Sequence, residues 1–398
     1  MSERSARRTR IAWLATHPIQ YQVPLLRAIA NSAQFELRAL FFSDFSARQY
    51  HDKEFGQAIA WDAPLLEGFD HVVLHEAKDP QEAFSFTRPR VPQLAQWLTR
   101  AHFDVVVIQG WNHHGYLYAA WLARRAGLKV ILRCEATDHV TGSQGLKRGV
   151  REAMLRWLFK RVDGFGAIGE HNRRFYLARG VAPSRIVDMP YCVDNDHFRE
   201  KAAQADLAAL RRELAIDTDD PVILYASKLT SRKYADLLLD AYCELPSPRP
   251  WLVVVGDGEL RPTLESRIRE RHLDRVRMAG FRNQGELPAF YALADVFVLP
   301  SVNETWGLVV NEAMNAGCAI VVTTQVGSGL DLVVDGVNGA VVPPGDLQAL
   351  QQALVNVLTD RRFTSMGDAS LEKISKWGIQ ENLAGLAEVI ERFNRAAR

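Results

Sequence analysis

The stretch SVNETWGLVVNEAMNAG, residues 301–317, decides the fold of the second half of the chain. It follows the apolar run VFVLPS (296–301), which is typical of a buried strand ending at Pro300. WGLVVNEAMNAG then has the pattern of a helix that ends at Gly317. The loop over residues 302–305 therefore lies where a strand ends and a helix begins, which is where open α/β sheets bind ligands.

Short apolar runs of this kind alternate with helical patterns along the whole chain. The predicted strands are residues 10–16, 35–42, 103–109, 128–134, 221–227, 251–258, 276–281, 296–301 and 319–324. Because the alternation occurs in both halves, the sequence predicts an α/β protein with two Rossmann-like, doubly wound domains. We place the first at 1–200 and the second at 201–375, with 376–398 forming a C-terminal helix that packs back toward the first domain.

Composition narrows the class of protein. The 398 residues fit two domains, and 48 basic against 47 acidic side chains leave a net charge of +1, so no nucleic-acid partner is expected. Four cysteines without CxxC spacing indicate neither a disulfide framework nor a zinc site. No apolar run approaches the roughly 20 residues of a membrane span, and the basic start lacks a signal-peptide core, so we expect a cytoplasmic protein.

Two glutamates mark the loop and the helix after it. A carboxylate accepts hydrogen bonds from two neighbouring hydroxyls but repels phosphate, so Glu304 and Glu312 suit two sugars. Eight helical residues rise about 12 Å, which would place one sugar at either end of a diphosphate. The amides at the helix start favour an anion between them, and these are the amides of Thr305, Trp306, Gly307, Leu308 and Val309. The alternative is a carboxylate at a helix start and a second, solvated one.

Cations follow the first strand of the second half. Lys228 and Lys233 lie five positions apart beside Arg232, and two such cations neutralise a diphosphate without a metal. Ordinary surface charge is the alternative. VVVGDGEL (253–260) ends another strand with a tight glycine turn, in which Gly256 permits close approach of a ligand or of backbone.

Residues 220–350 together resemble the retaining glycosyltransferases of family four, which have the two-domain GT-B fold. The resemblance rests on SKLTSRKYADLLLDAY (227–242), VVGDGEL (254–260) and the run from YALADVFVLPS to PPGD (291–346). In this family the E-x7-E element matches Glu304 to Glu312.

The resemblance implies a role for each matched residue. Glu312 would bind the ribose hydroxyls, and Glu304 would hold the transferred sugar as a catalytic residue. Lys228 and Lys233 would hold the diphosphate, although the family usually has arginine at 228, and lysine lacks the bidentate fork. The remaining donor-binding residues would be Phe281 and Arg282 beside the base and Gly256 in the nucleotide cleft.

The amino-terminal half matches the family less closely. Relatives place a glycine pair after the first strand, where this chain has ATHPIQYQVPLL, so His17, Gln20 and Tyr21 are candidates for contacts with the acceptor or donor. The alternative is a loop that merely starts a helix.

Further candidates follow two later strands. A histidine that meets the transferred sugar in relatives would correspond to the position near Glu135, with Asp138 and His139 following, and any of the three could face the sugar. Glu135 and His139 are the other catalytic candidates. His113 and His114 follow the strand at 103–109, and such a pair is more often engaged in capping or packing than in catalysis.

The implied reaction uses a UDP- or GDP-linked sugar as donor, no cofactor and no metal. Asp194–Asp196 and Asp217–Asp219 lie in the region between the domains, away from a strand end, so we expect no metal there. Retention would proceed by front-face attack through an oxocarbenium-like state. The acceptor would be a glycan or a lipid-linked sugar in cell-surface polysaccharide or glycoconjugate synthesis. A nucleotide-sugar epimerase or hydrolase, and a catalytically silent sugar-nucleotide-binding protein, are the alternatives.

Residues 145–162, GLKRGVREAMLRWLFKRV, form a basic amphipathic pattern. Six cations oppose one acid, and apolar residues recur at helical spacing with Trp157 and Phe159 among them. The pattern fits a helix on an anionic membrane, which would make the protein peripheral on the inner face. It fits equally a helix packed on its own sheet with a solvated basic face.

Overall fold

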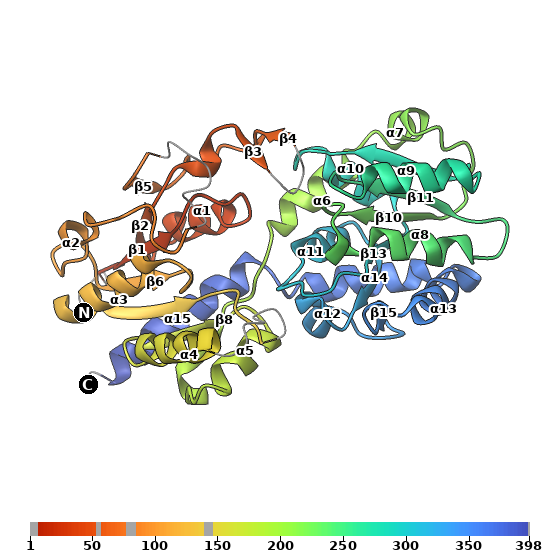
Figure 1. Cartoon of the computed structure of the whole chain (residues 1–398). Helices are drawn as coiled ribbons and strands as arrows, with labels where there is room; N and C mark the ends of the chain where they lie inside the picture. The colour runs from red at the N-terminus through yellow and green to blue at the C-terminus, as the bar shows by residue number, and fades with distance from the viewer. Residues whose placement is uncertain (1–6, 53–56, 77–84, 139–145, 397–398) are drawn as a thin grey trace, which may run out of the picture. The chain divides into compact units, whose positions relative to one another are not determined.

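The computed structural model describes residues 7–52, 57–76, 85–138 and 146–396 (Figure 1). Contacts divide the chain into two compact units. The first holds Met1–Tyr50, Ala63–Tyr191 and Ile379–Arg398, and the second holds His51–Asp62 and Cys192–Gly378. The division thus falls at residue 191 rather than 200, and a short segment from the amino-terminal half groups with the second unit. The C-terminal helix groups with the first.

The first unit is built on a seven-stranded parallel sheet. Its strands, in spatial order, are β5 (Asp70–Val73), β2 (Phe35–Phe41), β1 (Thr9–Ala15), β6 (Val105–Ile108), β7 (Lys129–Arg133), β8 (Gly164–Ala167) and β9 (Ile186–Asp188). The chain runs outward from β1 to β5 and then returns to continue from β6. The order therefore reverses between β1 and β6, which makes their carboxyl ends the switch point where doubly wound sheets bind ligands.

Helices cover both faces of this sheet, as the alternation along β1 requires. Ile11 and Trp13 face the core shared with α1 (Val23–Asn31) and α15 (Ile379–Ala396). Leu14 faces the opposite core, which the other helices supply. These helices are α2 (Leu94–Trp97), α3 (His114–Ala126), α4 (Leu146–Phe159) and α5 (Glu170–Leu177).

The second unit repeats the architecture with six parallel strands. Their order is β12 (Val276–Gly280), β11 (Trp251–Val255), β10 (Val222–Ala226), β13 (Val296–Leu299), β14 (Ala319–Thr323) and β15 (Gly339–Val342). The order reverses between β10 and β13. The loop with Lys228 and Lys233 (the lysine loop) and the loop with Glu304 (the glutamate loop) therefore follow the two strands at the switch point.

The elements around this second sheet complete the unit (Figure 1). The α-helices are α6 (Asn195–Ala203), α7 (Leu207–Glu213), α8 (Ala235–Cys243), α9 (Arg261–Glu270), α10 (Leu287–Leu293), α11 (Leu308–Asn315), α12 (Gly327–Leu332), α13 (Leu347–Leu358) and α14 (Phe363–Ile374). A 3-10 turn, η4 (Ser231–Lys233), precedes α8, and strands β3 (Tyr50–Asp52) and β4 (Gln57–Ile59) pair separately. Two parallel sheets with helices on both faces confirm the predicted α/β class, and all nine predicted strands are present.

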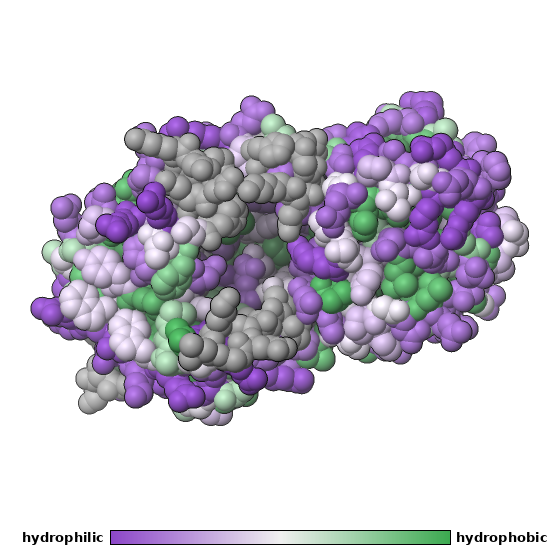
Figure 2. Space-filling view, in the orientation of Figure 1, coloured by the Kyte–Doolittle hydropathy of each residue, from purple (hydrophilic) through white to green (hydrophobic). Residues whose placement is uncertain are grey.

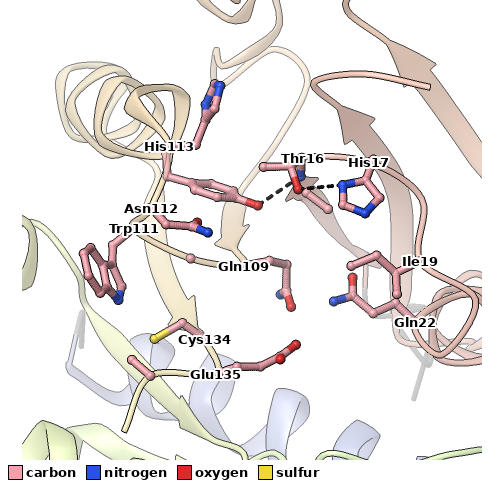
Figure 3. Close-up of a pocket in the computed structure, with 14 residues that line it drawn as sticks. Thr16, His17, Ile19, Gln22, Gln109, Trp111, Asn112, His113, Cys134 and Glu135 are labelled. Atoms are coloured by element: carbon pink, nitrogen blue, oxygen red, sulfur yellow. Dashed lines mark hydrogen bonds between the residues drawn. The ribbon is translucent and has the colours of Figure 1, made fainter. Parts of the chain in front are cut away.

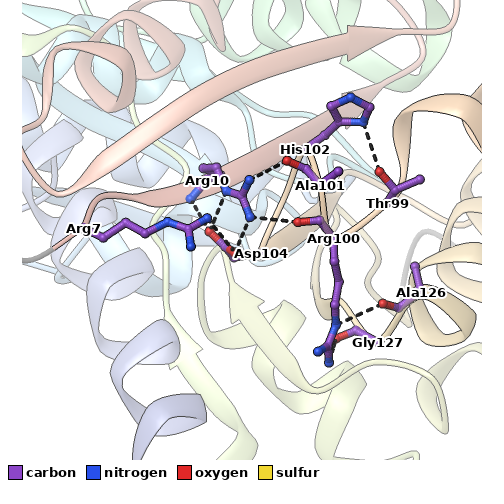
Figure 4. A network of polar contacts seen from close by, with 9 residues as sticks. All are labelled: Arg7, Arg10, Thr99, Arg100, Ala101, His102, Asp104, Ala126 and Gly127. Atoms are coloured by element: carbon purple, nitrogen blue, oxygen red, sulfur yellow. Dashed lines mark hydrogen bonds and ion pairs between the residues drawn. The ribbon is translucent and has the colours of Figure 1, made fainter.

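A network of charged side chains connects β1 and β6 at their amino ends, opposite the switch point (Figure 4). Arg10, on β1, donates from Nε and Nη2 to the two carboxylate oxygens of Asp104 at 3.1 and 2.8 Å. The same guanidinium donates to the carbonyls of Ala101 and Arg100. These hydrogen bonds hold the pKa of Asp104 below its usual range. The network therefore joins β1 to the turn that leads into β6.

Candidate active site

The loop between β13 and α11 is held by its neighbour after β14. The amide of Glu304 donates to the carbonyl of Gln325 at 3.1 Å, and the amide of Gly327 donates back to the carbonyl of Glu304 at 3.0 Å. A Cβ on Gly327 would lie 2.0 Å from the carbonyl oxygen of Thr305, so only glycine fits there. The backbone of Glu304 is thus fixed from both sides.

The side chain of Glu304 lies against two cations. Lys233, from η4, forms an ion pair with its Oε2, and Nη1 of Arg232 lies 3.5 Å from the same oxygen. Lys233 is buried, and the carboxylate of Glu304 provides a partner of opposite charge for it. The residues expected at the sugar and at the diphosphate are therefore direct neighbours in the second unit.

The other expected phosphate ligand is paired as well. Nζ of Lys228 lies 3.1 and 3.2 Å from the carboxylate oxygens of Asp52. The segment that carries Asp52 is also tied to the loop after β12, because Asn283 donates to the carbonyl of Ala60 and the amide of Gly285 donates to Asp62. An anion that binds Lys228 must therefore compete with a carboxylate.

Glu312 is fully buried on α11. Tyr291, on α10, donates its hydroxyl proton to Oε2 of Glu312 at 2.6 Å, whereas Oε1 has no partner within the part of the chain that the structure describes. Burial raises the pKa of this carboxyl to about 7, and the hydrogen bond from Tyr291 opposes that rise. A buried acceptor with one unused oxygen suits a hydroxyl donor.

The start of α11 differs slightly from the expectation. Gly307, with φ of +87°, is the N-cap, and the helix begins at Leu308 rather than Trp306. Of the stretch from Glu304 to Glu312, only the residues from Leu308 onward are helical. The predicted helical rise of about 12 Å between the two glutamates therefore does not apply. Trp306 is buried and stacks on Trp377 at 5.6 Å, so it can offer a ligand only its backbone.

The residues expected near the base surround the ends of β11 and β12. Gly256 has φ of +135°, and a Cβ there would lie 2.0 Å from the carbonyl oxygen of Ser227. Its conformation therefore holds the turn of the lysine loop. Phe281 is half-buried, and Arg282 forms ion pairs with Glu213 and Glu286.

The aspartate pairs have structural surroundings. Asp194 caps α6 by accepting from the amide of His197 at 3.1 Å, and Asp196 lies in the first turn of that helix. Asp217 and Asp219 lie in the loop before β10. Within the described ranges, no group of three or more His, Cys, Asp or Glu side chains is placed to hold a metal ion.

The first unit has its own cavity, of about 350 Å³, at the switch point (Figure 3). Thr16 and His17 reach it from the end of β1, Gln109 from β6, and Cys134 and Glu135 from β7. Nδ1 of His17 lies 3.0 Å from Oγ1 of Thr16, and burial lowers the pKa of His17 to about 4. The imidazole is therefore neutral at pH 7.

The other candidate residues of this half lie in different surroundings. Gln20 and Tyr21 are half-buried and do not line the cavity. His113 caps α3, because Nδ1 accepts from the amide of Gly115 and Nε2 donates to the carbonyl of Arg88. His114 contacts the carbonyl of Phe86 instead of the cavity. His139 lies outside the described residues.

Sequence reasoning missed three polar residues. Gln22 is 4% exposed and lines the cavity, and Gln109 faces it from the end of β6. Tyr291 was quoted only as part of a motif, although it is the partner of Glu312. Gln22 had a signal, since it is polar directly before an apolar helix face, but the signal equally fits a helix cap.

The basic helix α4 packs on its own sheet. Leu155, Leu158 and Phe159 are buried in the core, and the guanidinium of Arg161 stacks on Trp157. Arg148, Val150, Ala153, Arg156 and Lys160 are exposed. The described surface in Figure 2 is mostly hydrophilic, with hydrophobic residues in separate patches. Within the described ranges, no helix is both long enough and apolar enough to span a membrane.

Two family descriptions match most of the chain. Residues 207–376 match "Glycosyl transferases group 1", and residues 25–192 match "Glycosyl transferase 4-like domain". A GDP-mannose-dependent α-(1-6)-phosphatidylinositol monomannoside mannosyltransferase of Mycolicibacterium smegmatis is 32% identical over 68% of this chain and 72% of its own.

Two further proteins show the range of the likeness. An α-D-kanosaminyltransferase of Streptomyces kanamyceticus is 32% identical over 42% of this chain, and the match spans only 43% of that relative. A crystal structure of Anabaena Alr3699/HepE with UDP superposes with a TM-score of 0.71 at 18% identity, covering 97% of this chain and all of that one. This likeness places the chain in the GT-B fold.

Proposed function

Because the chain belongs to the group 1 glycosyl transferases, we propose that it moves a sugar from a nucleoside diphosphate donor to a hydroxyl of an acceptor. The observation that carries this proposal is the cluster of Glu304, Lys233 and Arg232 after the two strands at the switch point of the second unit. A carboxylate for sugar hydroxyls lies directly beside cations for phosphate. The UDP complex of HepE supports a nucleotide-linked donor.

We also propose that configuration at the anomeric carbon is retained and that no metal takes part. Lys228, Lys233 and the amides at the start of α11 would stabilise the charge that develops on the departing diphosphate. That diphosphate would accept the proton of the attacking hydroxyl. Glu304 would hold the transferred sugar, and Glu312 would hold the ribose.

The acceptor would belong to a cell-surface glycan or a lipid-linked sugar. The mannosyltransferase relative acts on a phosphatidylinositol monomannoside, as its name states. The exposed Arg148, Arg156 and Lys160 of α4 give this chain a basic face that would attract anionic lipid. Flotation with vesicles rich in phosphatidylglycerol tests this, and equal flotation of wild type and R148E/R156E/K160E would argue against docking through α4.

Donor turnover tests the reaction itself. UDP- and GDP-linked sugars are incubated with and without glycan acceptors, and products are followed by NMR of the anomeric proton. Transfer that requires an acceptor and retains configuration supports the proposal. Conversion of donor without acceptor would indicate an epimerase or hydrolase, and tight binding without turnover would indicate a silent binding protein.

A further inference from the structure

The cavity of the first unit contains two amide side chains whose hydrogen bonds are incomplete. Oε1 of Gln22 and Nε2 of Gln109 are both buried without a partner in the described part of the chain. Figure 3 shows that both amides point into the same space, with the carboxylate of Glu135 on its other side. Buried polar atoms left in this way require a ligand or water to complete them.

The structure explains why these amides point as they do. Nη1 of Arg133 donates to Oε1 of Gln109 at 3.3 Å, so the NH₂ group of Gln109 is the end left for the cavity. Gln22 precedes α1 and makes no side-chain cap bond, so its carbonyl oxygen is not used by the helix. One buried donor and one buried acceptor are therefore left without partners on residues that line this cavity, and a hydroxyl, which both donates and accepts, has the chemistry to complete both.

The charges around the cavity point the same way. None of the described residues that line it is a lysine or an arginine, and Glu135 supplies a carboxylate. His17 and His113 are neutral at pH 7, since burial lowers the pKa of each to about 4. Arg133 lies behind Gln109, 2% exposed, and donates to the carbonyls of Met189 and Pro190. Among the described lining residues, a phosphate would thus meet a carboxylate and no lysine or arginine.

We infer that this cavity receives the acceptor as an unphosphorylated polyhydroxylated ring, that Gln22 and Gln109 position one of its hydroxyls, and that Glu135 disfavours phosphorylated rings. The inference rests on the proposed transferase function and adds to it the charge class of the acceptor. The volume of the cavity, about 350 Å³, is at the small end of the range for small-molecule sites. The cavity is therefore large enough for a single sugar-sized ring.

Saturation-transfer NMR with the full chain tests the inference. The probes are matched pairs: myo-inositol with inositol 1-phosphate, and methyl α-mannoside with mannose 6-phosphate. We expect the unphosphorylated member of at least one pair to bind at least fivefold more tightly than its partner. Q22L and Q109L should each weaken that binding at least fivefold. Q96L, at an exposed position on α2 outside the cavity lining, should leave it unchanged. E135Q should reduce the difference in affinity between the two members of a pair.

Equal or tighter binding of the phosphorylated rings, binding unaffected by Q22L and Q109L, or no binding of any probe would overturn the inference. Affinity for UDP and GDP is measured for the same variants. If the variants bind nucleotides as the wild type does but the ring probes do not bind as expected, only the assignment of the acceptor is wrong. If neither nucleotide binds to the wild type, the proposed function itself fails. Preserved nucleotide binding also shows that the variants are folded.

Discussion

Tyr291 donates a 2.6 Å hydrogen bond to Oε2 of Glu312, and neither side chain is exposed to solvent. The pair joins α10 to α11 and leaves the second oxygen of the carboxylate for another donor. Burial raises the pKa of Glu312 from 4.5 to about 7, which means that the folded chain binds this proton more tightly than the unfolded chain does.

The pH dependence of stability follows from that pair. Between about pH 4.5 and 7 the folded state retains a proton that the unfolded state has lost, so the wild type should lose stability as pH rises through this window, by up to roughly 3 kcal/mol. E312Q should lack this loss. Urea unfolding midpoints from pH 4 to 8 measure this loss of stability. If the midpoints of the wild type and E312Q changed equally with pH, Glu312 would not be its source. Y291F should move the loss to higher pH.

Glu304 should act on transfer rather than on nucleotide binding. E304Q removes a sugar ligand while leaving Lys233 in place, so we expect kcat to fall by about 100-fold or more with little loss of nucleotide affinity. E312A should show the opposite pattern, with weakened nucleotide binding. E372Q, which removes an exposed charge on α14, is the matched control. An E304Q enzyme with wild-type kcat would remove the catalytic assignment.

Asp52 competes with an anion for Lys228. D52N removes the carboxylate 3.1 Å from Nζ, and we expect affinity for UDP or GDP to rise severalfold, consistent with about 1 kcal/mol for such a pair. D70N, which removes a carboxylate from an exposed ion pair on β5, should have no effect. Calorimetric titration with UDP and GDP measures the nucleotide affinity of both variants. Weaker nucleotide binding in D52N would show that Asp52 supports Lys228 rather than blocking it.

Gly256 holds the turn beside the lysine loop. G256A would force a Cβ to 2.0 Å from the carbonyl of Ser227 in a backbone conformation that disfavours side chains, so it should destabilise the chain by about 2 kcal/mol or more. G149A, inside α4 with open space around it, should be neutral or stabilising by about 0.5–1 kcal/mol. Chemical denaturation measures the stability of both variants. If G256A and G149A changed stability equally, the close approach at Gly256 would not be the cause.

The Arg10–Asp104 network should stabilise the first unit. The pKa of Asp104 is lowered by its hydrogen bonds to Arg10, so its contribution is present above the ordinary carboxyl range near pH 4 and is lost as pH falls below it. D104N should cost roughly 1 kcal/mol at pH 7, since the pair is partly exposed, and little at pH 2–3. A D104N penalty of the same size at both pH values would exclude the ion pair as its source.

The sequence was a good guide to strands that are apolar and covered on both faces. β10 and β13 are wholly buried, and their runs of valine, isoleucine and leucine had no competing interpretation. β8 and β15 were missed because both begin with glycine. A Cβ on Gly164 would lie 2.4 Å from Val389, and one on Gly339 would lie 1.8 Å from the carbonyl of Ile320, so close packing replaces the usual strand composition.

The position of the glutamate loop could be predicted because a motif fixes it, whereas neighbours that are distant in the sequence could not. The loop carrying Glu304 lies at a strand end beside Lys233, as expected. The roles of the individual residues stay predictions. Tyr291, 21 positions before Glu312, and Asp52, 176 positions before Lys228, meet their partners only in the folded chain. Gln22 was passed over for Gln20 because the loop gives no periodicity to show which glutamine faces inward.

Calorimetric titration of UDP- and GDP-linked sugars in the presence of EDTA tests the central claim most directly. That claim is that Lys228, Lys233 and the start of α11 bind a nucleoside diphosphate sugar without a metal. The account predicts binding of at least one donor to the wild type, weakened about 100-fold or more in K228A/K233A. Binding that requires a divalent ion, or that survives loss of both lysines unchanged, would contradict it.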